Sequence, residues 1–348
     1  MLCQKLLAII QDGFPLVERP YKALAEMLNC CAENDAGENE VSEECANLAV
    51  SEQEVFDEVE KMRASGVIRR IGGIYDSKKL GFISRLCAGK VPTSENDFAA
   101  EAHSQTPMEK FAAVVMSEPA ITHNYIRSHE YNVWFTVIAE NESAIQVVVD
   151  RVCSQTYLHD VHVLSATKKY KINTVMGKGA GAPSKNVFAS AVRQSPENAL
   201  TETDRTRIHI ACDDIPHSLT PFKDWGVSCD ELREDLAAKR MRRFGAILRH
   251  QDAGFPCNAM VCFMLDEGTL ANSESAGSLL AKKHYVSHCY ERPSFENFPY
   301  NLYAMMHAQT PEELNGYIKE SVALLDNPEY VVLHSLKELK KTSFRFFA

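Results

Sequence analysis

The sequence predicts an α+β protein made of two tandem copies of one two-domain unit, and three observations support this prediction. The pattern His-x-Tyr-x-Arg occurs at residues 123–127 and again at 288–292, each time followed by Tyr-Asn and an apolar run. The stretches RIGGIYDSKKLGF and RFGAILRHQDAGF, which begin at Arg70 and Arg243, align without a gap. The 348 residues also exceed the roughly 150 residues of one average domain. A repeat of this length is typical of two fused, related domains and not of a solenoid.

The first part of each copy is predicted to be a winged helix-turn-helix domain. In the first copy we expect helices at residues 2–12, 20–29 and 51–65, the last one opened by the capping-box pattern Ser-x-x-Glu. The stretch GVIRRIGGIYD should follow as a hairpin-like wing. The acidic, apolar-poor residues 30–49 are expected to be an inserted loop. The second copy is compressed here and should lack part of its second helix.

The second part of each copy is predicted to be a ferredoxin-like domain with the order β-α-β-β-α-β. In the first copy, four strand-like runs surround helices at about 94–116, broken at Pro107, and 142–156. The second copy repeats the order, with expected strands near 254–265, 284–292, 300–308 and 329–335.

The predicted boundaries follow from these patterns and from a stretch rich in Gly, Ala, Ser and Pro, which has linker composition. They are 1–75 (winged helix-turn-helix), 76–174 (ferredoxin-like), 175–200 (linker), 201–248 (shortened winged helix-turn-helix) and 249–348 (ferredoxin-like).

Composition argues against several functions. A net charge of −10 disfavours broad nucleic-acid binding, which needs Lys and Arg to neutralise phosphates. The expected recognition helix, SEQEVFDEVEKMRAS, is itself acidic, so no nucleic-acid partner is expected. The eleven Cys include no Cys-x-x-Cys pair, which favours reduced thiols over disulfides or zinc. With no secretory signal and no membrane-length apolar run, we expect a cytoplasmic protein without a membrane partner.

The repeated motif can place chemistry on one face of a strand. Because side chains alternate with period two, the His, Tyr and Arg of each motif share a face. Arg supplies a forked cation for carboxylates, and His can donate a proton or bind a metal. The alternative is that they are half-buried strand residues with satisfied hydrogen bonds, and the sequence leaves it open. The residues in question are His123, Tyr125 and Arg127 in the first copy and His288, Tyr290 and Arg292 in the second.

The turn between the wing and the next strand differs between the copies. The second copy has Arg249 and His250 where the first has Asp76 and Ser77, followed by Lys78. If both copies held equivalent sites, this turn should match. We therefore expect the copies to divide their roles, although a solvated turn would also explain the difference.

Two domains in this order resemble the Lrp/AsnC regulators, and the motifs resemble that family's enzymatic branch, the siroheme decarboxylases. The resemblance is carried by RRIGGIYDSKKLGF, ITHNYIRSHEYNVWFT, RFGAILRHQDAGFPCNAMVCF and SHCYERPSFENFPYNLYAMMHA. The first copy looks like the A subunit and the second like the B subunit, so the chain is expected to be an internal pseudo-heterodimer. Only the 30–49 insertion and the linker fall outside the resemblance.

The resemblance implies a carboxy-lyase that removes CO2 from the C12 and C18 acetates of siroheme, giving 12,18-didecarboxysiroheme. No separate cofactor is implied, because the iron arrives with the substrate. On the matching positions we predict catalytic roles for His288, His250, Tyr290 and Arg249. Substrate-binding roles are predicted for Arg292, His123, Tyr125, Arg127 and Lys78, and His288 or His123 is a candidate ligand to the substrate iron. His129 and His307 are less favoured, since a surface turn and a strand end explain them.

Two other functions remain open at this point. One is a ligand-responsive, DNA-binding regulator of the Lrp/AsnC type, which should be retained on DNA at low salt. The other is a heme-binding carrier, since His and Tyr in an apolar cleft can ligate iron without chemistry. Turnover of siroheme distinguishes the enzyme from both.

Overall fold

The computed structural model describes residues 2–35, 49–93, 105–172, 200–248, 255–266, 268–269, 275–341 and 344–347. They form two compact units: Met1–Leu80 with Ala182–Ala253 and Arg345–Ala348, and Gly81–Gly181 with Gly254–Phe344. We name them the helical unit and the sheet unit. Each unit contains parts of both sequence copies, so the copies pair within each unit. The predicted 175–200 linker lies almost entirely outside the described residues.

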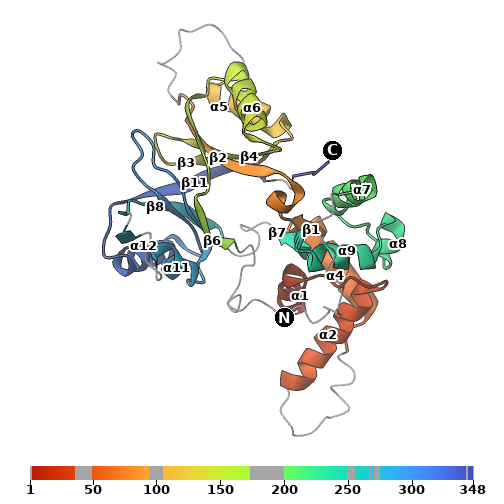
Figure 1. Cartoon of the computed structure of the whole chain (residues 1–348). Coiled ribbons are helices and arrows are strands. Elements are labelled where there is room, and N and C mark those ends of the chain that lie inside the picture. Colours follow the sequence, from red (N-terminus) through yellow and green to blue (C-terminus); the bar gives the residue numbers. More distant parts are fainter. Residues whose placement is uncertain are drawn as a thin grey trace. The chain divides into compact units, whose positions relative to one another are not determined.

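The helical unit contains the helices predicted for both copies (Figure 1). In α4 the predicted capping box is present, with the Ser51 side chain and Glu54 exchanging hydrogen bonds with each other's backbone. Helix α8 has only five residues, as expected from the compression of the second copy. Helix α2 continues into the predicted insertion, of which residues 36–48 lie outside the described chain. The bounds are α1 Leu2–Asp12, α2 Pro20–Asp35, α4 Glu52–Ala64, α7 Glu202–Ala211, α8 Pro221–Trp225 and α9 Cys229–Ala237.

The predicted hairpin-like wing is wrong. Strand β1 (Ile68–Tyr75) does not fold back on itself but pairs antiparallel with β7 (Met241–Leu248) of the second copy. The Gly72-Gly73 pair, which is typical of a turn in sequence, serves close packing instead. A Cβ at Gly72 would lie 2.3 Å from the carbonyl oxygen of Asp213. Each copy therefore supplies one strand to a shared two-stranded sheet.

A buried carboxylate joins the copies within the helical unit. Asp235 of α9 is 0% exposed. It accepts hydrogen bonds from Arg207 Nε (3.3 Å), Arg240 Nε (2.8 Å) and the Tyr75 hydroxyl (2.9 Å). Burial, together with this carboxylate, raises the pKa of Tyr75 far above its ordinary value, so its hydroxyl stays a donor. The single carboxylate thus satisfies a first-copy strand residue and two second-copy arginines.

The sheet unit confirms the order β-α-β-β-α-β in both copies. Pro107 occupies the start of α5, where a missing N–H costs nothing, and Thr106 caps the helix. The part of the predicted helix before residue 105 lies outside the described chain. The first copy supplies β2 Ile83–Lys90, α5 Pro107–Ser117, β3 Ile121–Arg127, β4 Val133–Ala139, α6 Glu142–Gln155 and β5 His159–Leu164. The second supplies β8 Cys257–Phe263, α11 Ala276–Ala281, β9 Val286–Glu291, β10 Leu302–Ala308, α12 Pro311–Leu324 and β11 Tyr330–Lys341.

The two copies exchange their last strands. The nine strands follow the order β5-β2-β4-β3-β11-β8-β10-β9-β6. Strand β6 (Lys168–Ile172) leaves the first copy and pairs with β9 of the second. In return β11 pairs with β8 through its first half and with β3 through its second half, running well past the predicted end at residue 335 (Figure 1).

Each half of the sheet has a helix-covered face and an opposite face that packs against the other copy. Two apolar clusters lie under the helices, one per copy. A third, which we name the inter-copy core, combines residues of both copies. Its buried members are Ala88, Tyr131, Trp134, Leu164, Met260, Cys262, Phe298, Tyr303 and Leu333. Separately, no helix among the described residues has the length and apolar character needed to cross a bilayer.

The Asn of the repeated motif holds the fold. The Asn132 side chain accepts from Val91 N (2.9 Å) and donates to Val91 O (2.7 Å). Asn301 makes the same pair of hydrogen bonds with Leu265, at 3.0 and 2.7 Å. The Tyr before each Asn donates to a carboxylate, Asp160 in the first copy and Glu329 in the second. The Tyr-Asn pair is therefore repeated because it has the same structural role in both copies.

Replacing Asp235 by Ala should lower the free energy of unfolding by about 3 kcal/mol, because it removes the buried acceptor that Tyr75, Arg207 and Arg240 share. Urea unfolding followed by circular dichroism measures this. Asp230→Ala on the same helix is the control: its side chain is 84% exposed, and its pair with Arg233 is worth at most about 1 kcal/mol. Equal losses in the two variants would contradict a central role for Asp235.

Asn301→Ala and Asn132→Ala should each cost about 2 kcal/mol, since each removes two hydrogen bonds worth about 1 kcal/mol apiece. Thermal unfolding of both variants tests this. The exposed α12 residue Asn315, changed to Ala, should shift stability by less than about 0.5 kcal/mol. A neutral Asn301→Ala would mean that this clamp is unimportant.

Candidate functional site

The His, Tyr and Arg of each motif line one face of a strand, as predicted. We name His123, Tyr125 and Arg127 on β3 the first strip. The second strip consists of His288 and Tyr290 on β9 and of Arg292, which directly follows β9. Tyr125 lies opposite Trp134, and Tyr290 lies opposite Tyr303, both members of the inter-copy core. The strips therefore belong to the face that each copy turns toward the other. Their His and Tyr side chains are half-buried.

The two arginines connect the copies reciprocally. Arg127 Nη1 donates to Leu333 O (3.1 Å) and to Ser335 Oγ (3.0 Å) of the second copy. Arg292 Nη1 donates to Leu164 O (2.9 Å) of the first copy. Each guanidinium also lies 5.0 Å from the ring of the Tyr in its own strip.

Both guanidinium groups are buried without a carboxylate partner among the described residues. Burial lowers the pKa of Arg127 to about 10 and also lowers the pKa of Arg292. Neither Nε has a hydrogen-bond acceptor in the described part of the chain. A buried cation in this state favours the approach of an anion. The predicted role in carboxylate binding stays a prediction, and the contact between copies is an additional role.

In both strips, the hydroxyl group of the preceding residue contacts Nδ1 of the histidine. The Nδ1 atom of His123 is 2.9 Å from Thr122 Oγ1, and the Nδ1 atom of His288 is 2.9 Å from Ser287 Oγ. Such a bond fixes the ring orientation and directs Nε2 to the other side. Nε2 is then the atom suited to meet a substrate.

The neighbours of the two tyrosines carry opposite charges. Lys169 of β6 is the cross-strand partner of Tyr290, whereas Glu338 of β11 is the partner of Tyr125. Cross-strand partners share a face of the sheet. An exposed cation therefore flanks the second strip and a carboxylate flanks the first. Because β6 comes from the first copy, the surroundings of the second strip are completed by the exchanged strand.

Met305 brings the two strips near each other. It is the cross-strand partner of His288 on β10. Its sulfur also lies 3.8 Å from Nη2 of Arg127, which reaches over from the first copy. Arg127 and His288, predicted from separate halves of the sequence, thus adjoin the same side chain.

Other predicted residues are not brought into this group. Arg249 and His250 lie outside the described residues, so their predicted roles remain untested. Lys78 belongs to the helical unit, in the short helix η1 (Ser77–Leu80), where its backbone N donates to Asp76 Oδ1 (2.9 Å). His129 lies half-buried in the β3–β4 turn and accepts from Tyr131 N (3.0 Å). Burial lowers the pKa of His129, which favours its neutral form.

Sequence reasoning did not name Ser287, and it explained His307 by its place at a strand end. His307 lies on β10 and is only 6% exposed. Its Nε2 atom is 2.8 Å from the Ser287 hydroxyl that also contacts His288. A signal was available, because residues 303, 305 and 307 share a strand face. It was discounted because His307 stands near the end of the run.

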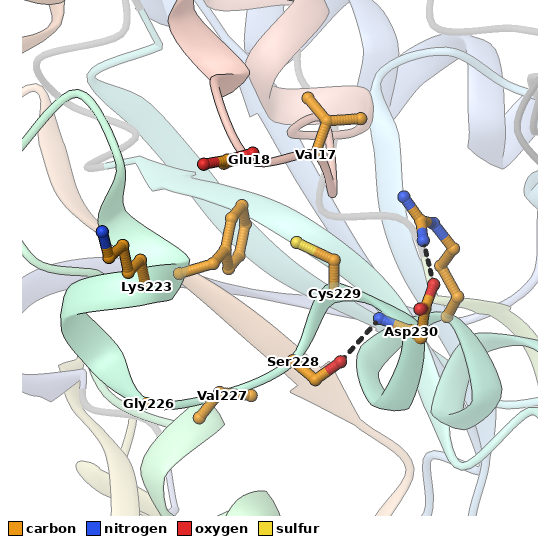
Figure 2. Close-up of a pocket in the computed structure, with 10 residues that line it drawn as sticks. Val17, Glu18, Lys223, Gly226, Val227, Ser228, Cys229 and Asp230 are labelled. Carbon is orange, nitrogen blue, oxygen red and sulfur yellow. Dashed lines mark hydrogen bonds and ion pairs between the residues drawn. The ribbon is translucent and has the colours of Figure 1, made fainter.

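Two cavities lie outside the second strip. In the sheet unit, a cavity of about 630 Å³ adjoins Arg127, His129 and Lys90. Lys90 is committed to ion pairs with Glu130 and Asp160. In the helical unit, a cavity of about 600 Å³ is lined by Cys229, Lys223 and Arg233, with no His or Tyr (Figure 2). Within this lining Arg233 forms an ion pair with Asp230. Neither cavity is lined by a residue of the second strip, and the cavity in the sheet unit includes Arg127 of the first strip.

The described residues contain no cluster of three or more His, Cys, Asp or Glu side chains that could hold a metal ion. Buried thiols such as Cys87 and Cys289 do not change this, because burial raises the pKa of each to about 12 and keeps the sulfur protonated. The chemistry of the strips is therefore that of proton donors and cations.

Comparison with known proteins agrees with this arrangement. The family model of the AsnC-like ligand binding domain matches residues 79–171 and 252–340, more than half of the chain and once in each copy. A second family model, the siroheme decarboxylase NirDL-like HTH domain, matches residues 4–34. The resemblance expected from the motifs is confirmed by these matches.

Curated relatives match the whole chain or half of it. The siroheme decarboxylase of Hydrogenobacter thermophilus is 29% identical over 99% of this chain and 94% of its own length. The siroheme decarboxylase alpha subunit of Desulfovibrio desulfuricans is 38% identical over 49% of this chain and 79% of its own. The beta subunit of Oleidesulfovibrio alaskensis is 38% identical over 42% of this chain and 98% of its own.

Solved structures lead to the same family. The crystal structure of the siroheme decarboxylase NirDL matches with a TM-score of 0.63 and 26% identity, covering 100% of this chain and 95% of that one. The structure of NirDL in co-complex with an iron-uroporphyrin III analogue matches with a TM-score of 0.61 and 25% identity, over 99% and 94% of the two chains. The chain therefore belongs to the siroheme decarboxylase family, and its two βαββαβ domains are AsnC-like ligand-binding domains.

Proposed function

We propose that this protein is a siroheme decarboxylase, a carboxy-lyase that removes CO2 from the C12 and C18 acetates of siroheme to give 12,18-didecarboxysiroheme. The observation that carries the proposal is the full-length similarity to a siroheme decarboxylase, with both motif strips in equivalent places on the paired sheets. The iron-porphyrin analogue bound to NirDL supports a tetrapyrrole as ligand. The iron enters with the substrate, and no separate cofactor takes part.

The reaction needs a proton at carbon and fixed carboxylates. Each acetate loses CO2, which leaves a carbanion-like methylene on the ring, and one proton converts that methylene into a methyl group. A positioned general acid speeds such a step, and cations hold the substrate's other carboxylates in register. In this proposal His288 donates the proton from Nε2 and Tyr290 orients the acetate. Arg292 binds a second carboxylate.

The second strip is the better reacting site on electrostatic grounds. Siroheme is a polycarboxylate, and Lys169 beside Tyr290 attracts it, whereas Glu338 beside Tyr125 repels it. Arg249 and His250, proposed as a further clamp and a further proton donor, also belong to the second copy. The charge of Lys169 and the proposed roles of Arg249 and His250 thus both favour the second copy as the reacting one.

The first copy completes this site instead of duplicating it. It supplies Lys169 on the exchanged strand and Arg127 next to Met305, which lies opposite His288. His123 and Tyr125 remain proposed contacts for the far side of the macrocycle, and the predicted substrate-binding role of Lys78 stays a prediction. Of the two strip histidines, either His288 or His123 could ligate the substrate iron. The pairing of unlike copies is thereby a requirement for activity.

The purified protein incubated anaerobically with siroheme should yield a tetrapyrrole that has lost two CO2 units, measured by mass spectrometry. His288→Gln should lower kcat by about 10²–10⁴, the usual contribution of a general acid. His123→Gln should act mainly on KM. Unchanged siroheme from folded wild-type protein would sink the proposal and favour a tetrapyrrole carrier, or a regulator if the protein is also retained on DNA at low salt. A normal kcat in His288→Gln would remove only that residue from the mechanism.

Charge reversal tests which strip receives the substrate. Lys169→Glu should weaken siroheme binding on the order of tenfold, because repulsion worth about 1 kcal/mol or more replaces attraction. The effect should shrink at high salt. Glu338→Lys is the matched control at the equivalent position and should leave binding unchanged or tighter. Absorbance titration with siroheme measures both, and equal effects would show that the strips do not differ in this way.

A further inference from the structure

We infer that His288 does not act alone but receives its proton through the Ser287 hydroxyl from His307. This relay rests on the proposed decarboxylation and adds two positioning residues to it. His307 is a reservoir that never touches the substrate, and Ser287 connects it to the donor.

The three side chains form a continuous path. Ser287 Oγ is 2.9 Å from Nδ1 of His288 and 2.8 Å from Nε2 of His307. Both distances lie within the hydrogen-bond range for proton transfer. Ser287 is 4% exposed and His307 is 6% exposed, whereas His288 is half-buried. The path thus runs from the interior to the only member that solvent or substrate can reach.

A local irregularity in the sheet makes the path. The register between β10 and β9 shifts after Met305, so that Met305 faces His288 but Met306 faces Val286. The extra residue in this bulge is Ser287, and its hydroxyl reaches both rings. Bulges of this kind re-aim side chains and occur next to active sites. A regular ladder would have placed Ser287 and His288 on opposite faces.

Only the second copy contains the whole path. In the first copy Thr122 holds His123 in the same way, but the position equivalent to His307 is Ile138. In the first copy the hydrogen-bonded path therefore ends at Thr122, because no second histidine lies beyond it. The difference between His307 and Ile138 is independent of the charges on Lys169 and Glu338, and it also favours the second copy as the reacting one.

The surroundings suit a residue that holds a proton and passes it on. Across the ladder His307 faces Asn258 of β8. Asn258 Oδ1 accepts from Ser335 Oγ, which in turn accepts from Arg127. The half-buried amide of Asn258 and the Ser335 hydroxyl thus connect the His307 environment to the Arg127 guanidinium. Their dipoles can adjust as the charge on His307 changes.

The transfer balances in protons. His307 begins as imidazolium with a proton on Nε2, and His288 begins neutral with its proton on Nε2. As His288 gives that proton to the methylene carbon, the Ser287 proton moves to His288 Nδ1, and the His307 proton moves to Ser287 Oγ. The carbon has gained one C–H bond, Ser287 is again a hydroxyl, and His307 is neutral. Before the second acetate reacts, solvent protonates His288 at Nε2, and the His288 Nδ1 proton returns through Ser287 to Nε2 of His307, which restores the starting state.

The test compares Ser287→Ala and His307→Gln with the wild type under siroheme turnover. Both should lower kcat by about 10- to 100-fold, part of the range for general acid catalysis, with KM and siroheme affinity little changed. Gln keeps a hydrogen-bond donor near Ser287 but cannot pass a proton on. A proton inventory in mixed H2O and D2O should curve for the wild type and become linear in both variants.

Three controls keep the outcomes separate. Ser287→Thr, which restores the hydroxyl found in the first copy, should recover most of the kcat, and Asn315→Ala on the exposed face of α12 should leave kcat unchanged. If His307→Gln folds normally and retains full kcat with a curved inventory, the relay is wrong and His307 is structural. If the wild type itself does not turn over siroheme, the proposed function fails, and the relay fails with it.

Discussion

The exchange of terminal strands is the constraint on which the rest of the structure depends. Because β6 pairs with β9 and β11 pairs with β3, neither sheet is complete without the other copy. The exchange brings the apolar faces of both sheets together in the inter-copy core. Arg127 and Arg292 can then be buried at that junction, because each finds a backbone carbonyl in the opposite copy. The functional strips lie on the same face, so folding and site assembly are one event.

Duplication followed by divergence explains why the repeated motif has mixed meaning. The Asn and the second Tyr keep the same structural contacts in both copies, and the two arginines keep equivalent ones. Differences appear around the histidines: Lys169 against Glu338, and His307 against Ile138. The same structural scaffold occurs in both copies, whereas Lys169 and His307, on which the proposed chemistry relies, have Glu338 and Ile138 as their counterparts. A symmetric pair could not have offered two different environments to one asymmetric macrocycle.

Sequence reasoning predicted the duplication, both βαββαβ domains and the shared face of each strip, because these depend on local periodicity and repetition. It failed where partners come from elsewhere in the chain. The hairpin-like wing was predicted wrongly, since nothing local indicates that β1 pairs with β7 or that Asp213 packs against Gly72. Ser287 could not be found, because a bulge is a property of two strands and not of one segment.

The long path of β11 has a consequence for synthesis on the ribosome. Arg127 and its partner Ser335 are 208 residues apart. At about 5–20 residues per second, the first half of the sheet waits about 10–40 s before the strand that covers its edge is made. During that time β3 presents an unpaired edge, the usual starting point for aggregation. Expression at a lower growth temperature, or together with chaperones that bind unpaired strand edges, should therefore raise the yield of folded protein.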